Sequence, residues 1–139
     1  MIFRNLVGAA LMATGLGGTA QAQFMSAEEV KPILAMTQSS WVGVRVWEGQ
    51  DLLYFTQLLS FRCGLDAILY GINGEAATNL YEMEPCHVGT PSPFSFDIDL
   101  FPVYVTFPVG SVHSVTIRLK YDDGTKEEVT FQRADIQLP

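Results

Sequence analysis

The sequence predicts an all-β protein, an antiparallel sandwich of seven to eight short strands with one short helix before them. Three observations support this class. Apolar and polar residues alternate with a period of two in several segments, turn signals recur about every 8 to 12 residues, and one segment near the start has helical periodicity instead. Two sheets packed face to face cover the apolar side of such strands.

Residues 1–22 have the pattern of a signal peptide. Arg4 precedes an apolar run over residues 6–16, and Ala20-Gln21-Ala22 forms a small-residue cleavage site. The apolar run is shorter than the roughly 20 residues that a transmembrane helix needs. We therefore expect a mature chain of one domain, residues 23–139, that is periplasmic or secreted and has no membrane anchor after cleavage.

The expected helix covers residues 27–37. Ser26 and Glu29 have the spacing of a capping box, in which a serine at the N-cap and a glutamate three residues on satisfy free backbone N–H groups. Val30 and Leu34 fall on one face of this segment, while Pro32 lies later than a first-turn proline normally would. We expect this helix to cover a face or an edge of a sheet.

The strongest strand pattern lies near the end of the chain and predicts a hairpin over residues 112–132. Apolar and polar side chains alternate on both sides of Asp122-Asp123-Gly124, which supplies the turn, with Gly124 in the left-handed conformation. One face of the hairpin is then apolar and requires a covering layer. The expected register sets Val115 opposite Phe131, Ile117 opposite Val129, Thr116 opposite Thr130 and Arg118 opposite Glu128.

Further segments also have the composition and alternation of strands. Gly49-Gln50 and Asn73-Gly74 are the expected turns between two pairs of them. In the first pair a two-residue loop would place Val44 opposite Phe55 and Arg45 opposite Tyr54. The predicted strands cover residues 41–47, 51–61, 65–72, 79–84, 94–100 and 103–107.

The terminal hairpin, with its Tyr-Asp-Asp-Gly-Thr turn, resembles the final hairpin of bacterial immunoglobulin-like or fibronectin-type-III-like modules. The resemblance covers residues 112–131, about a sixth of the mature chain. It implies an immunoglobulin-like antiparallel β-sandwich and no activity, because the hairpin contains no catalytic residues. The Cys-Trp-Cys order of immunoglobulin domains is absent, since Trp41 and Trp47 both precede Cys63.

The two cysteines, Cys63 and Cys86, are predicted to form a disulfide, because both lie in a domain expected to enter an oxidising compartment. Closing this loop would stabilise the fold by roughly 3 kcal/mol in the chain-entropy model. The alternative is a reactive Cys86 thiol with His87 as its base. Neighbours on a strand point to opposite faces, which disfavours that pair.

The acidic composition limits the classes of partner. The net charge of −7 becomes −8 when Arg4 leaves with the signal peptide, which argues against nucleic acid and against an anionic membrane surface. Solubility is the simplest role of this charge, and a specific cationic partner is the alternative.

The sequence offers little support for catalysis. It has two histidines and lacks the Gly-x-Ser-x-Gly, His-Glu-x-x-His and phosphate-binding glycine motifs, so we expect no enzyme activity and no cofactor. His113 is expected on the core-facing side of its strand, opposite Arg133.

Two clusters are candidate binding sites. Trp41, Arg45, Trp47 and Tyr54 share one face of the first predicted hairpin, where flat rings beside a guanidinium suit a saccharide, a peptide or a partner protein. The alternative is that this face is internal. The sequence therefore suggests a non-catalytic binding or accessory module.

The second cluster supports a different function, a periplasmic metal-binding protein. Glu82 and Glu84 share a face of their predicted strand, and His87 follows after a proline turn. A disulfide at Cys86 would remove the thiolate that a copper site prefers.

Overall fold

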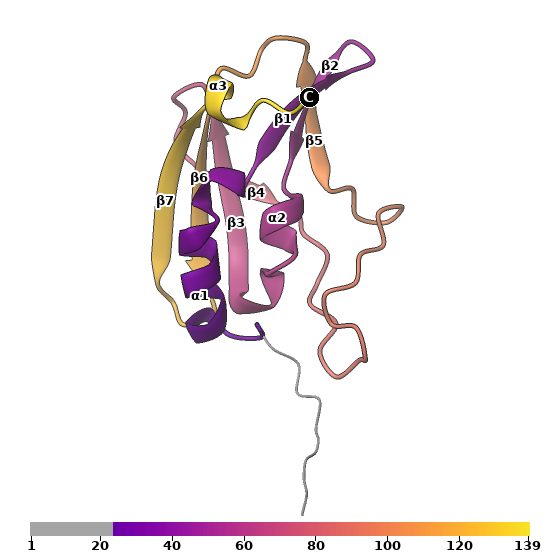
Figure 1. Cartoon of the computed structure of the whole chain (residues 1–139), viewed down its shortest axis with the longest axis vertical. Coiled ribbons are helices and arrows are strands. Elements are labelled where there is room, and N and C mark those ends of the chain that lie inside the picture. Colours follow the sequence, from indigo (N-terminus) through magenta and orange to yellow (C-terminus); the bar gives the residue numbers. More distant parts are fainter. Residues whose placement is uncertain (1–23) are drawn as a thin grey trace, which may run out of the picture.

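The computed structural model describes residues 24–139, which form two antiparallel sheets together with short helices (Figure 1). The predicted signal peptide and Gln23 lie outside the described residues. One sheet has the strand order β1-β2-β5 and the other β4-β3-β6-β7, so the expectation of a mostly β protein with two antiparallel sheets is confirmed. The strands are β1 (Gly43–Trp47), β2 (Gln50–Tyr54), β3 (Leu65–Ile72), β4 (Asn79–Tyr81), β5 (Tyr104–Pro108), β6 (Ser114–Tyr121) and β7 (Lys126–Gln132).

The apolar core lies between the two sheets and is completed by two helices. In Figure 1, α1 (Ala27–Met36) and α2 (Thr56–Leu59) lie in front of the lower half of the four-stranded sheet, below β1 and β2. Leu34 of α1, Leu58 of α2, Leu53 of β2 and Ile117 of β6 are all fully buried in one cluster. The helices thus cover the part of the large sheet that the smaller sheet does not reach.

The terminal hairpin has the predicted register. Val115 pairs with Phe131, Ile117 with Val129, Thr116 with Thr130 and Arg118 with Glu128 in β6 and β7. At the turn, Gly124 has a φ of 87°, and its N–H donates to the Tyr121 carbonyl at 3.0 Å. A bulged turn with a left-handed glycine therefore sets the pairing, as expected from the sequence.

The start of α1 is capped as predicted, and the hairpin turn adds to the cap. The Ser26 hydroxyl accepts the Glu29 N–H, and Glu29 accepts the N–H groups of residues 24 and 25. Asp122 accepts the Ala27 N–H at 2.8 Å, which binds this helix end to the β6–β7 turn. Negative groups at a helix N-terminus also interact favourably with the helix dipole. Pro32 lies inside the helix, which ends at Met36, one residue earlier than expected.

The second predicted strand is shorter than expected. β2 ends at Tyr54, and the chain continues through α2 and the single turn η2 (Arg62–Gly64) rather than as a strand to residue 61. Phe55, Leu58 and Leu59 are all buried at the i, i+3, i+4 spacing of a helix. That spacing explains the helix and was present in the sequence.

The first hairpin has a different register from the predicted one. Its turn residues are Glu48 and Gly49, both with positive φ as in a type I′ turn, so Val44 pairs with Leu53 and Arg45 with Leu52. The register therefore shifts by two residues. A shift of two leaves every side chain on its predicted face, because side-chain direction alternates with period two.

The predicted strand over residues 94–100 is absent. The Asp97 carboxylate accepts the N–H groups of Asp99 and Leu100, a local turn that competes with strand pairing. Ile98 and Leu100 are 62% and 72% exposed. The alternation in this segment therefore does not mark a buried face. The fourth strand is also shorter than predicted and ends at Tyr81.

Asn73 and Gly74 adopt positive φ as a tight turn would, but they do not form a two-residue hairpin. The pairing of β3 with β4 stops at Tyr70, which leaves a longer connection. The Asn73 side chain instead accepts the N–H groups of His113 and Ser114. His113 is exposed rather than core-facing, because it lies before β6 and the neighbouring Val112 takes the buried position.

A buried ion pair connects the two sheets. Asp51 of β2 is fully buried, and its carboxylate accepts the Gly110 and Val112 N–H groups at 2.9 and 3.1 Å. Arg133, which follows β7, donates to both oxygens of Asp51. These Arg133 bonds, with smaller contributions from the two backbone groups, outweigh burial and lower the pKa of Asp51. The carboxylate is therefore charged in the folded state.

We expect Gly124→Val to destabilise the fold far more than Thr116→Ala. Valine would be forced to a positive φ, at a cost above about 1 kcal/mol. Thr116→Ala removes a hydroxyl contact with Thr130 on an exposed face, worth a few tenths to about 1 kcal/mol. Urea denaturation of both variants measures the difference, and equal midpoints would contradict the turn assignment.

Asp51→Asn should destabilise the fold at neutral pH and flatten its loss of stability in acid. Because the pKa of Asp51 is lowered by folding, its contribution is complete above about pH 4 and is lost as the pH falls further. At pH 7 the change should cost roughly 3 kcal/mol or more, since the Arg133 charge loses its partner.

Unfolding free energies of wild type and Asp51→Asn, measured from pH 7 to about pH 2, check this expectation. Glu128→Gln removes one partner of an exposed pair with Arg118 and serves as the control, with a loss of about 1 kcal/mol or less. Parallel acid limbs for wild type and Asp51→Asn would show that the buried carboxylate does not titrate as described.

Candidate functional site

Of the four predicted binding residues, Arg45, Trp47 and Tyr54 lie in β1 and β2, and Trp41 lies before β1. Trp41 is fully buried, its indole N–H donates to the Leu34 carbonyl at 2.8 Å, and its ring packs edge-on against Phe131. It has helical φ and ψ after the turn η1 (Gln38–Ser40), and β1 starts only at Gly43. The strand alternation therefore does not extend back to Trp41, whose ring belongs to the core although the residue also lines the cleft described below.

Arg45, Trp47 and Tyr54 occupy the outer face of the three-stranded sheet, where Tyr104 of β5 joins them. The register places Tyr54 between Gly43 and Tyr104 across the sheet. The opposite face of these strands points into the core, where Val44 is fully buried. The sheet thus has a core face and a largely exposed face, on which Leu52, the partner of Arg45, is buried.

We call Arg45, Trp47, Tyr54 and Tyr104 the aromatic platform. The Arg45 guanidinium lies 5.5 Å from the centre of the Trp47 ring, and the rings of Tyr54 and Tyr104 are 5.4 Å apart. Trp47 is 54% exposed and Tyr104 39% exposed. A cation stacked on the Trp47 ring at one end of the strands and a pair of tilted tyrosine rings toward the other end form an amphipathic surface open to solvent.

Tyr104 was missed because the sequence does not show which strands pair. The predicted strand over residues 103–107 exists nearly as expected, as β5. Over residues 103–107, the exposed Tyr104 and Thr106 alternate with apolar residues that are less exposed. This alternation indicates that Tyr104 lies on a solvent face. Only the pairing of β5 with β2 brings Tyr104 next to Tyr54.

A cleft of about 610 Å³ opens beside the aromatic platform, and Arg45 and Tyr54 line both. Its polar lining comes from separate parts of the chain, with Gln57 on α2 and Gln137 near the C-terminus. Pockets of this volume are in the range of small-molecule sites. The hydroxyl-bearing residues that also line the cleft are Ser39, Ser40, Thr56 and Ser60.

The C-terminal segment forms one wall of this cleft and is fixed to β1. Gln137 makes an isolated parallel bridge with Val44, and the Leu138 N–H donates to the Val44 carbonyl at 2.8 Å. A Cβ at Gly43 would lie 2.7 Å from the Leu138 side chain, so a larger residue there would require that side chain to move. The wall therefore depends on backbone pairing as well as on side chains.

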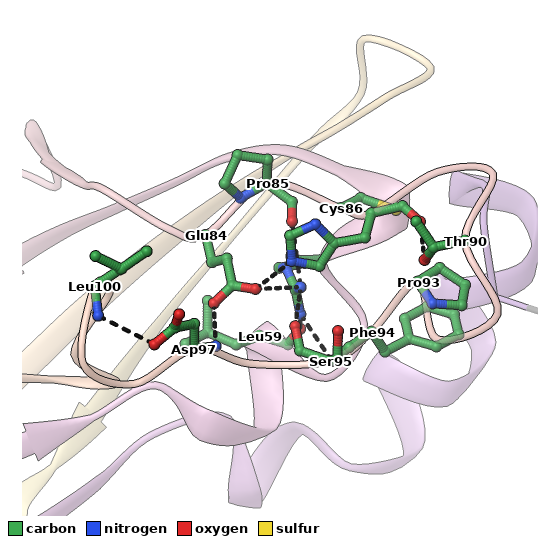
Figure 2. A network of polar contacts seen from close by, with 12 residues as sticks. Leu59, Glu84, Pro85, Cys86, Thr90, Pro93, Phe94, Ser95, Asp97 and Leu100 are labelled. Atoms are coloured by element: carbon green, nitrogen blue, oxygen red, sulfur yellow. Dashed lines mark hydrogen bonds and ion pairs between the residues drawn. The ribbon is translucent and has the colours of Figure 1, made fainter.

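Glu84 of the second predicted cluster contacts a buried arginine, Arg62, whose role the sequence did not indicate. The Arg62 guanidinium donates to the carbonyls of Leu59, Pro85 and Ser95 at 3.0, 3.2 and 2.7 Å and lies 3.5 Å from Glu84. Figure 2 shows Leu59, Pro85, Ser95 and Glu84 converging on this point. We call this set of contacts the Arg62 network. It fixes the long segment between β4 and β5 to α2.

Glu84 and His87 of the predicted metal cluster are in contact, and Glu82 is exposed. Burial acts to raise the pKa of Glu84, but the Asp97 N–H, His87 and Arg62 together outweigh it and lower the pKa. The Arg62 cation thus competes with a metal ion for this carboxylate. Within residues 24–139, no group of three or more His, Cys, Asp or Glu side chains is arranged to hold a metal ion.

The disulfide between Cys63 and Cys86 is present, as predicted. It joins the residue after Arg62 to the residue after Pro85, so the covalent bond and the Arg62 network fix the same two segments. This pairing leaves Cys86 without the thiol that a nucleophilic or copper site would use. The alternative of a reactive Cys86 with His87 as its base is therefore wrong.

Comparisons of the chain with protein-family models, with curated proteins and with solved structures find no match. Among residues 24–139, no helix combines the length and the apolar character needed to cross a bilayer. The assignment of a function to the aromatic platform and the cleft therefore depends on their own geometry and chemistry.

We expect Arg62→Leu to destabilise the fold by roughly 3 to 5 kcal/mol, because it leaves Glu84 as a buried charge with one cationic partner removed. Several carbonyls also lose their donor. Arg118→Leu breaks the exposed pair with Glu128 and should cost about 1 kcal/mol or less. Urea denaturation compares the two variants, and similar losses would contradict a stabilising role for the Arg62 network.

Proposed function

We propose that this protein is an exported, non-catalytic binding module that holds its ligand on the outer face of the three-stranded sheet. The observation behind this proposal is the exposed aromatic platform, which lies beside a cleft and shares Arg45 and Tyr54 with it. Tryptophan, tyrosine and arginine are the residues most often responsible for binding energy at interfaces. Here they lie on a rigid sheet rather than on loops.

The buried core cluster does not include the platform residues. The inner face of the same strands already contributes Val44 and Leu53 to the buried cluster, and the buried Trp41 is supplied from before β1. Exposed large aromatic side chains gathered on one face are unusual in a soluble domain and mark interaction sites. This distribution favours a binding role for Trp47 over a structural one.

Two observations support export. The N-terminal segment has the pattern of a signal peptide, and the Cys63–Cys86 disulfide suits an oxidising compartment such as the periplasm or the extracellular space.

We also propose that the sandwich is of the immunoglobulin-like class. The constant-type immunoglobulin order places strands A, B and E in one sheet and C, F and G in the other. β1, β2 and β5 correspond to the first set and β3, β6 and β7 to the second. β4 pairs with β3 instead of joining the smaller sheet, an arrangement that favours the fibronectin-type-III-like variant.

Trp47→Ala should weaken ligand binding strongly with little loss of stability, whereas Trp41→Ala should mainly lower stability. Truncating an interface anchor weakens binding by about 2 kcal/mol or more, roughly 30-fold, while emptying a fully buried tryptophan site costs roughly 3 to 5 kcal/mol of folding free energy. Arrays of oligosaccharides and peptides measure binding, and thermal denaturation measures stability.

Acrylamide quenching of the two single-tryptophan variants gives the control. The emission of Trp47, observed in Trp41→Phe, should be accessible and red-shifted, and that of Trp41, observed in Trp47→Phe, should be shielded. A shielded Trp47, or a Trp47→Ala variant that loses stability as much as Trp41→Ala does, would refute a binding role for the platform.

A further inference from the structure

The cleft contains enough chemistry to suggest what the platform binds, and this inference rests on the proposed function. Three separate parts of the chain contribute polar groups to one concave site: Ser39 and Ser40 from η1, Gln57 and Ser60 from α2 and the residue after it, and Gln137 from the C-terminal segment. Uncharged hydroxyl and amide groups that approach from several sides suit a ligand with many hydroxyl groups of its own.

Several of these groups are available for a ligand. Within the described residues, the side chains of Ser39, Ser40 and Gln57 make no hydrogen bond. Gln137 accepts the Arg133 Nε–H through its amide oxygen at 2.9 Å, which leaves its amide N–H groups as donors. Ser60 donates to the Thr56 carbonyl and keeps its acceptor capacity. The lining therefore offers donors and acceptors together, the combination that each sugar hydroxyl requires.

The two charged side chains that line the cleft have opposite signs. Arg45 and Asp135 both line it, and neither forms an ion pair within residues 24–139. The guanidinium is a fixed set of donors and the carboxylate is an acceptor. The chain as a whole is acidic, which disfavours an anionic ligand through long-range repulsion. A neutral ligand uses both charged side chains as hydrogen-bonding groups.

An extended peptide is a poorer fit to this site. A peptide that adds to a sheet forms backbone hydrogen bonds with an exposed edge strand. At the cleft, the edge of β1 is already paired, because the Leu138 N–H donates to the Val44 carbonyl and Gln137 bridges the same residue. Recognition in the cleft must therefore use side chains, which suits a compact ring more than a strand.

The aromatic platform continues the cleft across the sheet. Tyr54 and Arg45 belong to both, and Tyr104 lies beyond Tyr54 in the same row of the sheet. The C–H face of a pyranose ring is apolar and packs on aromatic rings, while the hydroxyl groups at its rim need polar partners. The platform supplies the rings and the cleft supplies the partners.

We infer that the site binds a neutral oligosaccharide, with one sugar ring in the cleft and the next ring stacked on the aromatic platform. The ligand spans both parts, so a chain of two or more rings binds more tightly than a single ring. The affinity for this ligand depends little on salt, because the ligand carries no net charge.

The test is a titration of the mature protein with neutral homo-oligosaccharides of increasing length, chosen from those that bind on a glycan array. Acidic oligosaccharides and short peptides are titrated alongside. Trp47 emission and calorimetry report binding at about 50 and 500 mM NaCl. We expect saturable binding of a neutral oligosaccharide, a gain from one ring to two, and a change of less than about twofold with salt.

Gln57→Ala and Asp135→Asn should each weaken that binding roughly three- to tenfold, the effect of one lost hydrogen bond. Gln132→Ala changes an exposed glutamine of β7 in the other sheet and is the matched control, with affinity unchanged. Melting temperatures of all three variants should equal that of wild type. If Gln57→Ala lowers the melting temperature, the affinity of Asp135→Asn alone tests the role of the cleft.

The outcomes separate this inference from the proposed function. Binding of peptides or of acidic oligosaccharides alone, abolished by Trp47→Ala, refutes the neutral ligand and leaves the binding module intact. Suppose instead that a neutral oligosaccharide binds, that Gln57→Ala and Asp135→Asn weaken its binding, and that Trp47→Ala does not. This result refutes the role of the aromatic platform and supports binding in the cleft. If neither the array nor the titrations show any binding, both are refuted.

Discussion

The position of the candidate site depends on one buried carboxylate. Asp51 holds the Gly110 and Val112 N–H groups on one side and the Arg133 guanidinium on another, so β2 is joined to the segments that flank the terminal hairpin. Arg133 also donates to Gln137, which in turn bridges Val44 of β1. The same ion pair therefore orients the two sheets and, through Arg133, holds the C-terminal wall of the cleft. A buried charge with fewer partners would be destabilising.

The opposite wall of the cleft has a comparable support. Gln57 and Ser60 lie on or next to α2, and the guanidinium of Arg62 just beyond them donates to the Leu59 carbonyl at the end of that helix. A four-residue helix is not stable by itself, so its position must come from tertiary contacts. The Arg62 network and the neighbouring disulfide provide them. Both walls are thus positioned before a ligand arrives, which lowers the entropic cost of binding.

Local rules in the sequence predicted local structure well. The left-handed Gly124 and the capping Ser26 were identified correctly because each acts on residues close to it in the chain. The contacts that build the site were not predictable in the same way. Asp51 follows a turn, and aspartate is a residue type common in turns. Nothing in the sequence indicates its contact with Arg133, which lies 82 residues away. Tyr104 likewise joins the platform only through strand pairing.

Both edges of the three-stranded sheet have features that limit strand pairing with another chain. Unpaired strand edges are the usual route to unwanted association. Leu138 pairs with Val44 on the edge of β1, and Pro102 and Pro108, which cannot donate a backbone hydrogen bond, stand just before and at the end of β5. Association through the backbone is thereby limited at both edges. The flat face with Trp47 is left as the part of this sheet that a ligand can approach, and side chains rather than strand pairing select what binds there.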